Sequence, residues 1–318
     1  MDNIYENKIS DIKFSQKESV FFYNSFNKDY KVDNIAAFDL DWTLSYSQKH
    51  LFPKEEDDIH ILPNRRETLI DLIDRGFTLV IFTNQYSKSK KEKLKKVGRV
   101  TTFINKINLP MMVFISTEKD CYRKPEIGMY KMFLKMIKEL PSNIIYIGDA
   151  LGRPQDFSDS DRLFGEAISS SKIYAPEDMF PSTLLPIFES KKEIVIFVGA
   201  PGTGKSSFYM KNLEKTHIYI CQDILKTKAN VLKLLKKSIL TGKSIVIDST
   251  NPLLETREVY YNLAKEYDYN IKVLYFARDG YGFNKLRENP VPDICYHIFF
   301  KKLEAPTEEN TPGELIIV

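Results

Sequence analysis

The chain has 318 residues, and at roughly 100–200 residues per domain this length favours two domains. Its 43% hydrophobic and 28% charged residues, with 13 Gly and 15 Pro, exclude collagen-like and wholly disordered chains. The 46 basic and 43 acidic residues leave a net charge of +3, which is too small to indicate nucleic-acid binding by itself.

Cysteine use and hydropathy predict an intracellular protein, nuclear or cytoplasmic. Cys121, Cys221 and Cys295 lie far apart in the sequence, so neither a zinc site nor a disulfide framework is indicated. No apolar run approaches the roughly 18 residues that a membrane-spanning helix needs, and the polar N-terminus is unlike a signal peptide. We therefore expect no membrane partner, and a monomer is the default expectation.

Residues 1–33 are predicted to be an N-terminal extension, which could add an antiparallel hairpin to the sheet of a first domain at 34–180. From residue 34 onward, short β-branched runs alternate with amphipathic stretches, as is typical of a doubly wound parallel sheet with crossover helices. Strands are predicted at 35–39, 77–83, 111–116, 143–148 and 172–174, and helices at 65–74 and 126–139.

Two carboxylates, Asp39 and Asp41, lie two residues apart at the end of the first of these strands. One carboxylate bound to Mg²⁺ can attack phosphorus, and the second can protonate the leaving alkoxide and later activate water. On its own this spacing is common, and a structural explanation is preferred.

Further polar residues follow the later strands, and the carboxyl ends of parallel strands share one edge of a sheet. A phosphate would find hydrogen-bond donors and cations in Thr83, Asn84, Arg123 and Lys124. Asp149 can complete a Mg²⁺ site with Asp39 and Asp41. Asp161 is a further acidic candidate, ranked below Asp149 because an acid in the first turn of a helix is its simplest explanation.

The densest basic run of the chain spans residues 88–99. It could follow a DNA backbone, but a solvated helix face explains it at least as well, so it is not counted as a site.

The proline-containing stretch 176–192 suits a connector between domains, and the linker is placed at 181–192. A second α/β domain is predicted at 193–318. Its strands are expected at 193–198, 218–221, 244–247 and 271–276, and its helices at 205–213, 225–240 and 254–267.

The sequence GAPGTGKS at 199–206 matches the pattern G-x-x-x-x-G-K-[ST], directly after a predicted strand and before a predicted helix. Backbone N–H groups of such a loop bind phosphate oxygens, the lysine adds a cation, and the serine binds Mg²⁺. A nucleoside triphosphate such as ATP is therefore predicted, against the alternative of an ordinary strand-to-helix turn. The predicted contacts are Gly199, Gly202, Thr203, Gly204, Lys205 and Ser206.

Two further carboxylates are predicted to face the triphosphate. Asp248 could hold Mg²⁺, and Asp223 is assigned as the base that takes a proton from an attacking hydroxyl. A role as helix cap is as good an explanation for Asp248 alone. The basic stretch 280–290, on a predicted helix, contains Arg287 and could act as a lid, although a solvated basic face is favoured on that signal alone.

Together these motifs resemble the haloacid-dehalogenase (HAD) phosphatase superfamily, through D-L-D at 39–41, T-N at 83–84, K-P at 124–125 and G-D at 148–149. More narrowly, VIFTNQ, YRKP, GDALGRP and DRLF in the first domain resemble the family of polynucleotide kinase 3′-phosphatases. In the second domain GAPGTGKS, QD, DSTNP, RE and EAPT resemble the kinase domain of the same family. The resemblance covers nearly all of residues 35–318, with a HAD-like phosphatase before a P-loop kinase.

This resemblance implies a bifunctional enzyme that repairs DNA ends. A Mg²⁺-dependent 3′-phosphatase would work through an aspartyl-phosphate on Asp39, with Asp41 as acid and base. An ATP-dependent kinase would phosphorylate 5′-hydroxyls, with Asp223 as base and with Lys205 and Arg287 on the phosphates. The expected partners are DNA or RNA strand ends and, functionally, a DNA ligase, which joins the termini produced.

The chain also departs from the pattern of that family. Residues 1–33 are too short for the forkhead-associated domain of the animal enzymes, so no phosphopeptide scaffold is expected as a partner. Trp42 replaces a usual glycine, and it either lines the substrate opening or impairs the site. Lys285 stands where arginine is more usual, so more of the assignment rests on Arg287.

Other hypotheses stay open at this point. One is a phosphatase–kinase fusion that acts on RNA ends or small metabolites, and another is a form with only one active domain. A non-catalytic scaffold is a third, although the chain keeps every expected nucleophile, base and metal ligand.

Overall fold

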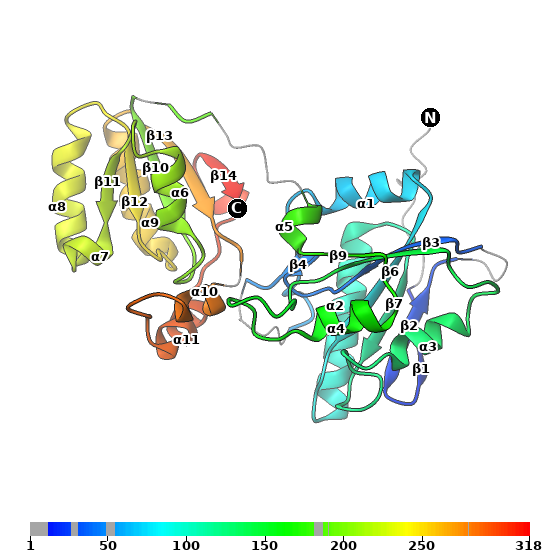
Figure 1. Cartoon of the computed structure of the whole chain (residues 1–318). Coiled ribbons are helices and arrows are strands. Elements are labelled where there is room, and N and C mark those ends of the chain that lie inside the picture. Colours follow the sequence, from blue (N-terminus) through cyan, green and yellow to red (C-terminus); the bar gives the residue numbers. More distant parts are fainter. Residues whose placement is uncertain (1–11, 27–30, 49–54, 181–186, 190, 279) are drawn as a thin grey trace. The chain divides into compact units, whose positions relative to one another are not determined.

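The computed structural model describes residues 12–26, 31–48, 55–180, 187–189, 191–278 and 280–318. These residues form two compact units, and each unit has its own sheet and its own hydrophobic core (Figure 1).

The first unit is built on a sheet with the strand order β1-β2-β7-β6-β3-β8-β9. Its strands are β1 (Ser15–Lys17), β2 (Val20–Asn24), β3 (Asn34–Phe38), β6 (Phe77–Asn84), β7 (Met112–Ser116), β8 (Asn143–Ile147) and β9 (Lys172–Tyr174). The last five are parallel, whereas β1 and β2 form an antiparallel hairpin that joins the edge of the sheet through β2 and β7. A separate short ladder pairs β4 (Ser45–Tyr46) with β5 (His60–Ile61).

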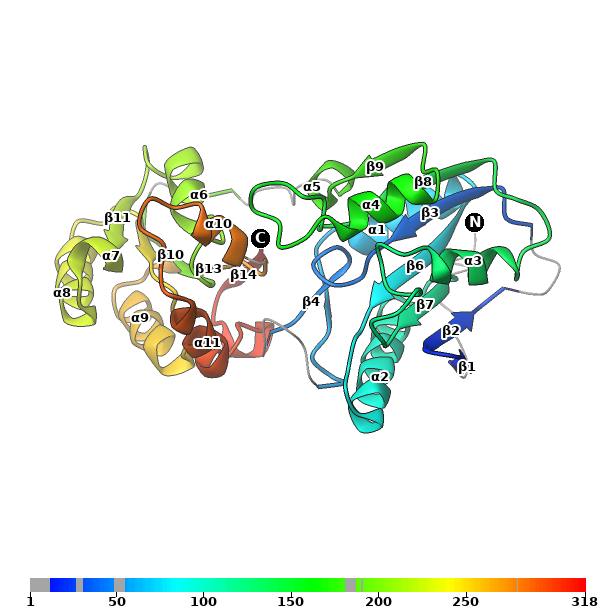
Figure 2. The same ribbon diagram turned by 60° about the horizontal axis from the view of Figure 1, so that its bottom comes forward.

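Helices cover both faces of this sheet (Figure 2). The helices are α1 (Arg65–Asp74), α2 (Lys90–Ile107), α3 (Gly128–Leu134), α4 (Ser160–Ala167) and α5 (Pro176–Met179). Successive strand residues point to opposite faces, so Ala36 and Phe38 of β3 pack with α1 and α2, whereas Ile35 and Ala37 pack with α3 and α4. Burial on both faces explains why these strands are almost continuously apolar.

The second unit is built on a parallel sheet with the order β11-β12-β10-β13-β14. Its strands are β10 (Glu193–Val198), β11 (Ile218–Cys221), β12 (Ile245–Asp248), β13 (Asn270–Tyr275) and β14 (Glu314–Ile317). Its helices are α6 (Lys205–Asn212), α7 (Gln222–Leu225), α8 (Lys228–Ile239), α9 (Leu254–Glu266), α10 (Tyr281–Lys285), α11 (Asp293–Lys302) and the 3₁₀ turn η1 (Glu308–Asn310).

Both units are doubly wound parallel α/β folds, which confirms the predicted fold class. Among the helices that the structure describes, none combines the length and apolar character needed to cross a membrane. The residue bounds proposed for the domains and the linker stay predictions.

Several predicted elements were wrong in extent. The helix expected at 225–240 is two helices, because Lys226 adopts a positive φ of 67° and the Thr227 side chain then caps α8 by accepting from the N–H of Asn230. The helix expected at 126–139 is only α3. The helix expected to carry Arg287 ends earlier, as α10, so Arg287 lies beyond it.

Candidate active sites

The first site lies where β3 ends. Asp39 follows this strand directly, is 8% exposed, and its N–H donates to the carbonyl of Ile147 at 2.9 Å. Asp149 is two residues beyond Ile147, so the pairing of β3 with β8 brings the two carboxylates together. Because β6 and β7 lie on one side of β3 and β8 and β9 on the other, this is the switch point at which open α/β sheets bind ligands.

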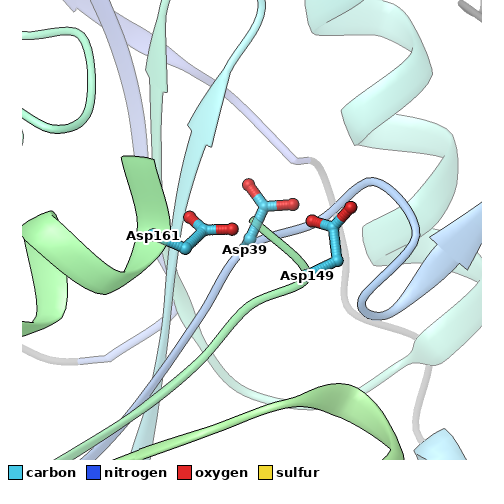
Figure 3. A group of neighbouring side chains, drawn as sticks. All are labelled: Asp39, Asp149 and Asp161. Carbon is cyan, nitrogen blue, oxygen red and sulfur yellow. The ribbon is translucent and has the colours of Figure 1, made fainter. Parts of the chain in front are cut away.

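Three carboxylates converge there: Asp39, Asp149 and Asp161 each offer an oxygen, and these oxygens lie within 4.8 Å of one another (Figure 3). Asp161, which the sequence ranked lower, is 1% exposed and belongs to α4. The Asp161 carboxylate can lie beside the other two only because residue 148 is glycine. A Cβ at Gly148 would lie 2.5 Å from the Asp161 carboxyl carbon.

Lys124 is the cation at the centre of this acidic group. Its Nζ donates to Asp39 Oδ1 at 2.5 Å, to Asp161 Oδ1 at 2.7 Å and to the Tyr146 hydroxyl oxygen at 3.0 Å. The Tyr146 hydroxyl and the N–H of Ala150 also donate to Asp161, at 2.8 Å and 3.1 Å. Asp161 therefore fixes the lysine that contacts the predicted nucleophile.

The electrostatics of the group suit a metal ion. Burial raises the pKa of Asp39 to about 7, against the attraction of Lys124. Burial, followed by the charges of Asp39 and Asp161, raises the pKa of Asp149 well above its usual range. Three carboxylates around one lysine carry excess negative charge, and a divalent cation bound by oxygen ligands would relieve it. The arrangement could therefore hold a metal.

Asp41 points elsewhere, although it was also predicted as a metal ligand. Its carboxylate accepts from Arg99 Nη2 at 2.6 Å and from Gln85 Nε2 at 2.7 Å. Burial would raise the pKa of Asp41, but Arg99 and then Gln85 more than offset it, so the pKa lies below its usual value. The carboxylate of Asp41 is thus oriented by neighbours of its own.

The predicted phosphate-binding residues surround the same strand ends. Asn84 holds the backbone of Lys124, since its side chain accepts from the Lys124 N–H at 2.9 Å and donates to the Lys124 carbonyl at 3.1 Å. Thr83 Oγ1 accepts from Gln85 at 2.9 Å, which leaves its own proton to donate. Arg123 has a buried Nη1 without a hydrogen-bond partner among the described residues, as suits a group that awaits an anion.

Arg99 and Gln85 are the residues of this site that the sequence-based reasoning did not find. Arg99 was counted in the basic run 88–99, yet it is 1% exposed. A signal was present, because Arg99 stands one helical turn before Phe103 and two before Ile107, which are buried residues of α2. A charge on the apolar stripe of a helix indicates a buried partner.

The second site follows β10. The loop between β10 and α6 has Gly202 and Gly204 at φ values of 79° and 92°, which favour glycine. Lys205 Nζ donates to the carbonyls of Gly199 and Ala200 at 2.9 Å and 2.7 Å. Burial lowers the pKa of Lys205 to about 8.

Ser206 and Asp248, the two residues predicted to hold a metal, meet beside this loop. Ser206 Oγ donates to Asp248 Oδ2 at 2.7 Å, and the Tyr219 hydroxyl donates to the same oxygen at 2.5 Å. Asp248 is the last residue of β12, and the next helix has Leu253 as its N-cap, so Asp248 is not a helix cap.

A cavity of about 710 Å³ joins the predicted residues of this unit. Its walls include Gly202, Thr203, Gly204, Lys205, Ser206, Asp223, Asp248 and Arg287. Asp223 lies in the first turn of α7. Gly199 does not line the cavity, and a Cβ at this position would meet Phe276 and Thr203. The arrangement suits a phosphorylated ligand beside a carboxylate that can accept a proton.

Comparison with known proteins finds a match for each unit. A model of the polynucleotide kinase 3 phosphatase family matches residues 34–180. A bifunctional polynucleotide phosphatase/kinase of Schizosaccharomyces pombe is 30% identical over 94% of this chain and 83% of its own length. That match spans both units.

Two further relatives are similar. A protein of Acanthamoeba polyphaga mimivirus, which carries a provisional name of the same kind, is 28% identical over 87% of this chain and 82% of its own. The polynucleotide 3′-phosphatase ZDP of Arabidopsis thaliana is 33% identical over 55% of this chain and 28% of its own.

Proposed function

This chain belongs to the family of bifunctional polynucleotide phosphatases/kinases, and from this premise we propose that it heals broken nucleic-acid ends with one reaction in each unit. The first unit removes a 3′-phosphate, and the second phosphorylates a 5′-hydroxyl with ATP. The 3′-hydroxyl and 5′-phosphate produced are the termini that a DNA ligase joins, so a ligase acts after this enzyme. The observation that carries the proposal is the presence of two separate sites built for phosphate chemistry, one in each unit.

In the first unit Asp39 is the nucleophile. Its carboxylate attacks phosphorus, the bond between phosphorus and the 3′-oxygen breaks, and the phosphoryl group passes to Asp39. Asp41 in its protonated form gives a proton to the leaving oxygen. The resulting carboxylate then takes a proton from the water that hydrolyses the aspartyl-phosphate and frees inorganic phosphate. The contact of Lys124 with Asp39 supports a role for Lys124, with Arg123 and Thr83, in binding the phosphoryl oxygens.

Asp39, Asp149 and Asp161 are the side chains that would hold Mg²⁺ in this unit. When bound, the ion offsets the negative charge that otherwise opposes the approach of a phosphate to three carboxylates. The other residues act around it: Lys124 orients Asp39, and Asn84 holds Lys124 in place.

In the second unit the loop 199–206 and Lys205 bind the triphosphate, and Ser206 and Asp248 would hold its Mg²⁺. The hydrogen bond between Ser206 and Asp248 at the cavity wall supports this assignment. Asp223 takes the proton of the 5′-hydroxyl as that oxygen attacks the γ-phosphorus and ADP leaves. Arg287, which lines the same cavity, neutralises the transferring phosphoryl group.

The decisive assay uses purified protein with nicked DNA that carries a 3′-phosphate and a 5′-hydroxyl, together with ATP and Mg²⁺. We expect release of phosphate and labelling of the 5′ end. Asp39→Asn should abolish only phosphate release, and Lys205→Ala only 5′ labelling, because the two sites lie in different units. Loss of both activities from either substitution would contradict two independent sites. The same ends presented in RNA form a second arm, in which equal rates would extend the substrate to RNA.

A further inference from the structure

Arg99 is a buried cation that the mechanism above does not use. It is 1% exposed and stands on α2. Its Nη2 donates to Asp41 Oδ1 at 2.6 Å, and its Nε donates to the carbonyl of Asp58 at 3.2 Å. Its Nη1 is buried and has no hydrogen-bond partner among the described residues. The guanidinium therefore joins the helix, the segment before β5 and the loop that carries Asp41.

A stabilising role alone does not explain a charge at this position. A buried ion pair gains little over well-packed apolar residues of similar volume, because desolvation of both charges offsets their attraction. The neighbours of Arg99 on α2, Phe103 and Ile107, are part of an apolar core that would accept such a residue. Arg99 also differs from Lys124, because its contact is with the predicted proton carrier and not with the nucleophile.

The two anchors of Asp41 are complementary. Arg99 binds Oδ1, and Gln85 binds Oδ2 while its amide also donates to Thr83 Oγ1 at 2.9 Å. Each oxygen of the Asp41 carboxylate therefore accepts a hydrogen bond from a different part of the chain. Together the two bonds fix the plane of the carboxylate as well as its direction. Each oxygen keeps a second lone-pair site, so the carboxylate can still exchange a proton with substrate.

We propose that Arg99 is a positioning residue of the phosphatase, which holds the Asp41 carboxylate in the orientation from which it exchanges a proton with the 3′-oxygen of the substrate. This role rests on the proposed function of the first unit. A carboxylate held in one orientation before substrate arrives does not lose rotational freedom during the reaction, which is why displacement of a catalytic group by a small distance slows a reaction strongly.

The test compares two leaving groups. The 3′-oxygen of an oligonucleotide needs a proton as it leaves, whereas the phenolate of 4-nitrophenyl phosphate leaves without one. In Arg99→Met we expect phosphate release from a 3′-phosphorylated oligonucleotide to fall about 100-fold, as for loss of general acid catalysis. The first-turnover release of 4-nitrophenol should fall less than about 3-fold, because that step does not use Asp41. An equal fall for both substrates would show a merely structural role and overturn the proposal.

A double-mutant cycle separates action through Asp41 from any other effect. In the Asp41→Asn background, Arg99→Met should change oligonucleotide dephosphorylation by less than about 3-fold, because its target is already absent. A full additional loss would contradict the proposal. Arg99→Lys keeps the charge with one donor group, so it should recover part of the oligonucleotide rate.

The matched control is Lys95→Met on the same helix, because Lys95 is 38% exposed and pairs with Glu55 instead of Asp41. Both phosphatase rates should stay unchanged in it. Because the units have separate cores, the fluorescence of Trp42, which lies in the first unit, reports the amount of folded phosphatase unit in every sample. If Arg99→Met does not fold, the comparison of leaving groups is made with Arg99→Lys, and an equal fall for both substrates again overturns the proposal. Absence of oligonucleotide dephosphorylation in the unaltered protein would instead contradict the proposed function.

Discussion

Two explanations compete for the acidic residue Asp161 when only the sequence is considered. It lies in the first turn of α4, where an acidic side chain interacts favourably with the helix dipole. It also accepts hydrogen bonds from Lys124 and Tyr146 and shares a potential metal site with Asp39 and Asp149. The sequence pattern alone favoured the first explanation, because Tyr146 and Lys124 are distant in sequence and meet Asp161 only in the folded sheet.

Asp161→Asn should weaken Mg²⁺ binding by the phosphatase. The substitution removes one negative charge from the group of three carboxylates, so the Mg²⁺ concentration for half-maximal phosphate release should rise about 10-fold. The measurement is a Mg²⁺ titration of oligonucleotide dephosphorylation, with kinase activity as the internal control. If high Mg²⁺ concentrations do not restore the rate, Asp161 acts through Lys124 and not on the metal.

The residues of the first site were predictable to the extent that they follow strands. Asp39, Thr83 and Asp149 lie at the carboxyl ends of β3, β6 and β8, and a parallel sheet necessarily brings such residues to one edge. Arg99 was not predictable in this way, since its contact with Asp41 depends on how α2 is rotated against the sheet. Helix rotation is decided by packing of the whole apolar stripe and not by one residue.

At the scale of elements, the strands were predicted more accurately than the helices. The strands β9, β10 and β11 have the expected bounds, and β10 and β11 are short, mainly apolar runs bordered by polar residues. The prediction of one helix at 225–240 was wrong at Lys226. A positive φ is unusual for lysine, so no feature of the sequence indicates a break at this residue. The end of α10 before Arg287 was not predicted either. The Asn284 side chain bonds to both backbone groups of Val291, a contact between residues seven positions apart that the helical pattern does not indicate.

A buried charged cluster ties together the amino-terminal parts of the second unit's strands. Glu193, the first residue of β10, is fully buried; its Oε2 accepts from Lys272 Nζ at 2.7 Å, and its Oε1 lies 3.1 Å from His217 Nε2. Burial would raise the pKa of Glu193, but the hydrogen bonds of His217 and Lys272 more than offset this, so the pKa is lowered from 4.5. The ionised form is therefore favoured in the folded unit.

This cluster predicts an acid-dependent stability of the second unit. A carboxyl with a lowered folded-state pKa stabilises fully above its unfolded value of 4.5, and this contribution is lost as the pH falls below that value. Glu193→Gln should lower the unfolding free energy at about pH 7 by about 2 kcal/mol and should weaken the dependence on acid. Urea unfolding at about pH 7 and about pH 4 measures both effects.

Glu314→Gln is the control for this prediction, because Glu314 approaches the same lysine at 3.6 Å but is 52% exposed. It should change the unfolding free energy by less than about 0.5 kcal/mol. Equal destabilisation by the two substitutions would contradict the importance of the buried contacts.

At the scale of the whole molecule, the two units have separate sheets and separate cores. The chain contains one tryptophan, Trp42, and this residue lies in the first unit beside Asp41. Trp42 has a φ of 61°, the left-handed conformation for which glycine is usual, and its N–H donates to the carbonyl of Ser45 at 2.7 Å. Tryptophan fluorescence therefore reports on one unit alone.

Ligands should stabilise the units separately. Mg²⁺ should raise the thermal midpoint followed by Trp42 fluorescence, whereas a non-hydrolysable ATP analogue in the absence of Mg²⁺ should leave it unchanged. Circular dichroism, which records both units, should show the shift caused by the analogue. At a concentration of about 100 times Kd the stabilisation is about 2.7 kcal/mol. A single transition that either ligand shifts would contradict independent unfolding of the units.

The bonds of Lys205 to the carbonyls of Gly199 and Ala200 have a consequence for turnover. An ammonium group that already contacts two carbonyls gives up these hydrogen bonds when it turns to a phosphate. The bonds that Lys205 leaves offset part of its attraction for the nucleotide. Weaker net attraction favours departure of the product nucleotide after each cycle.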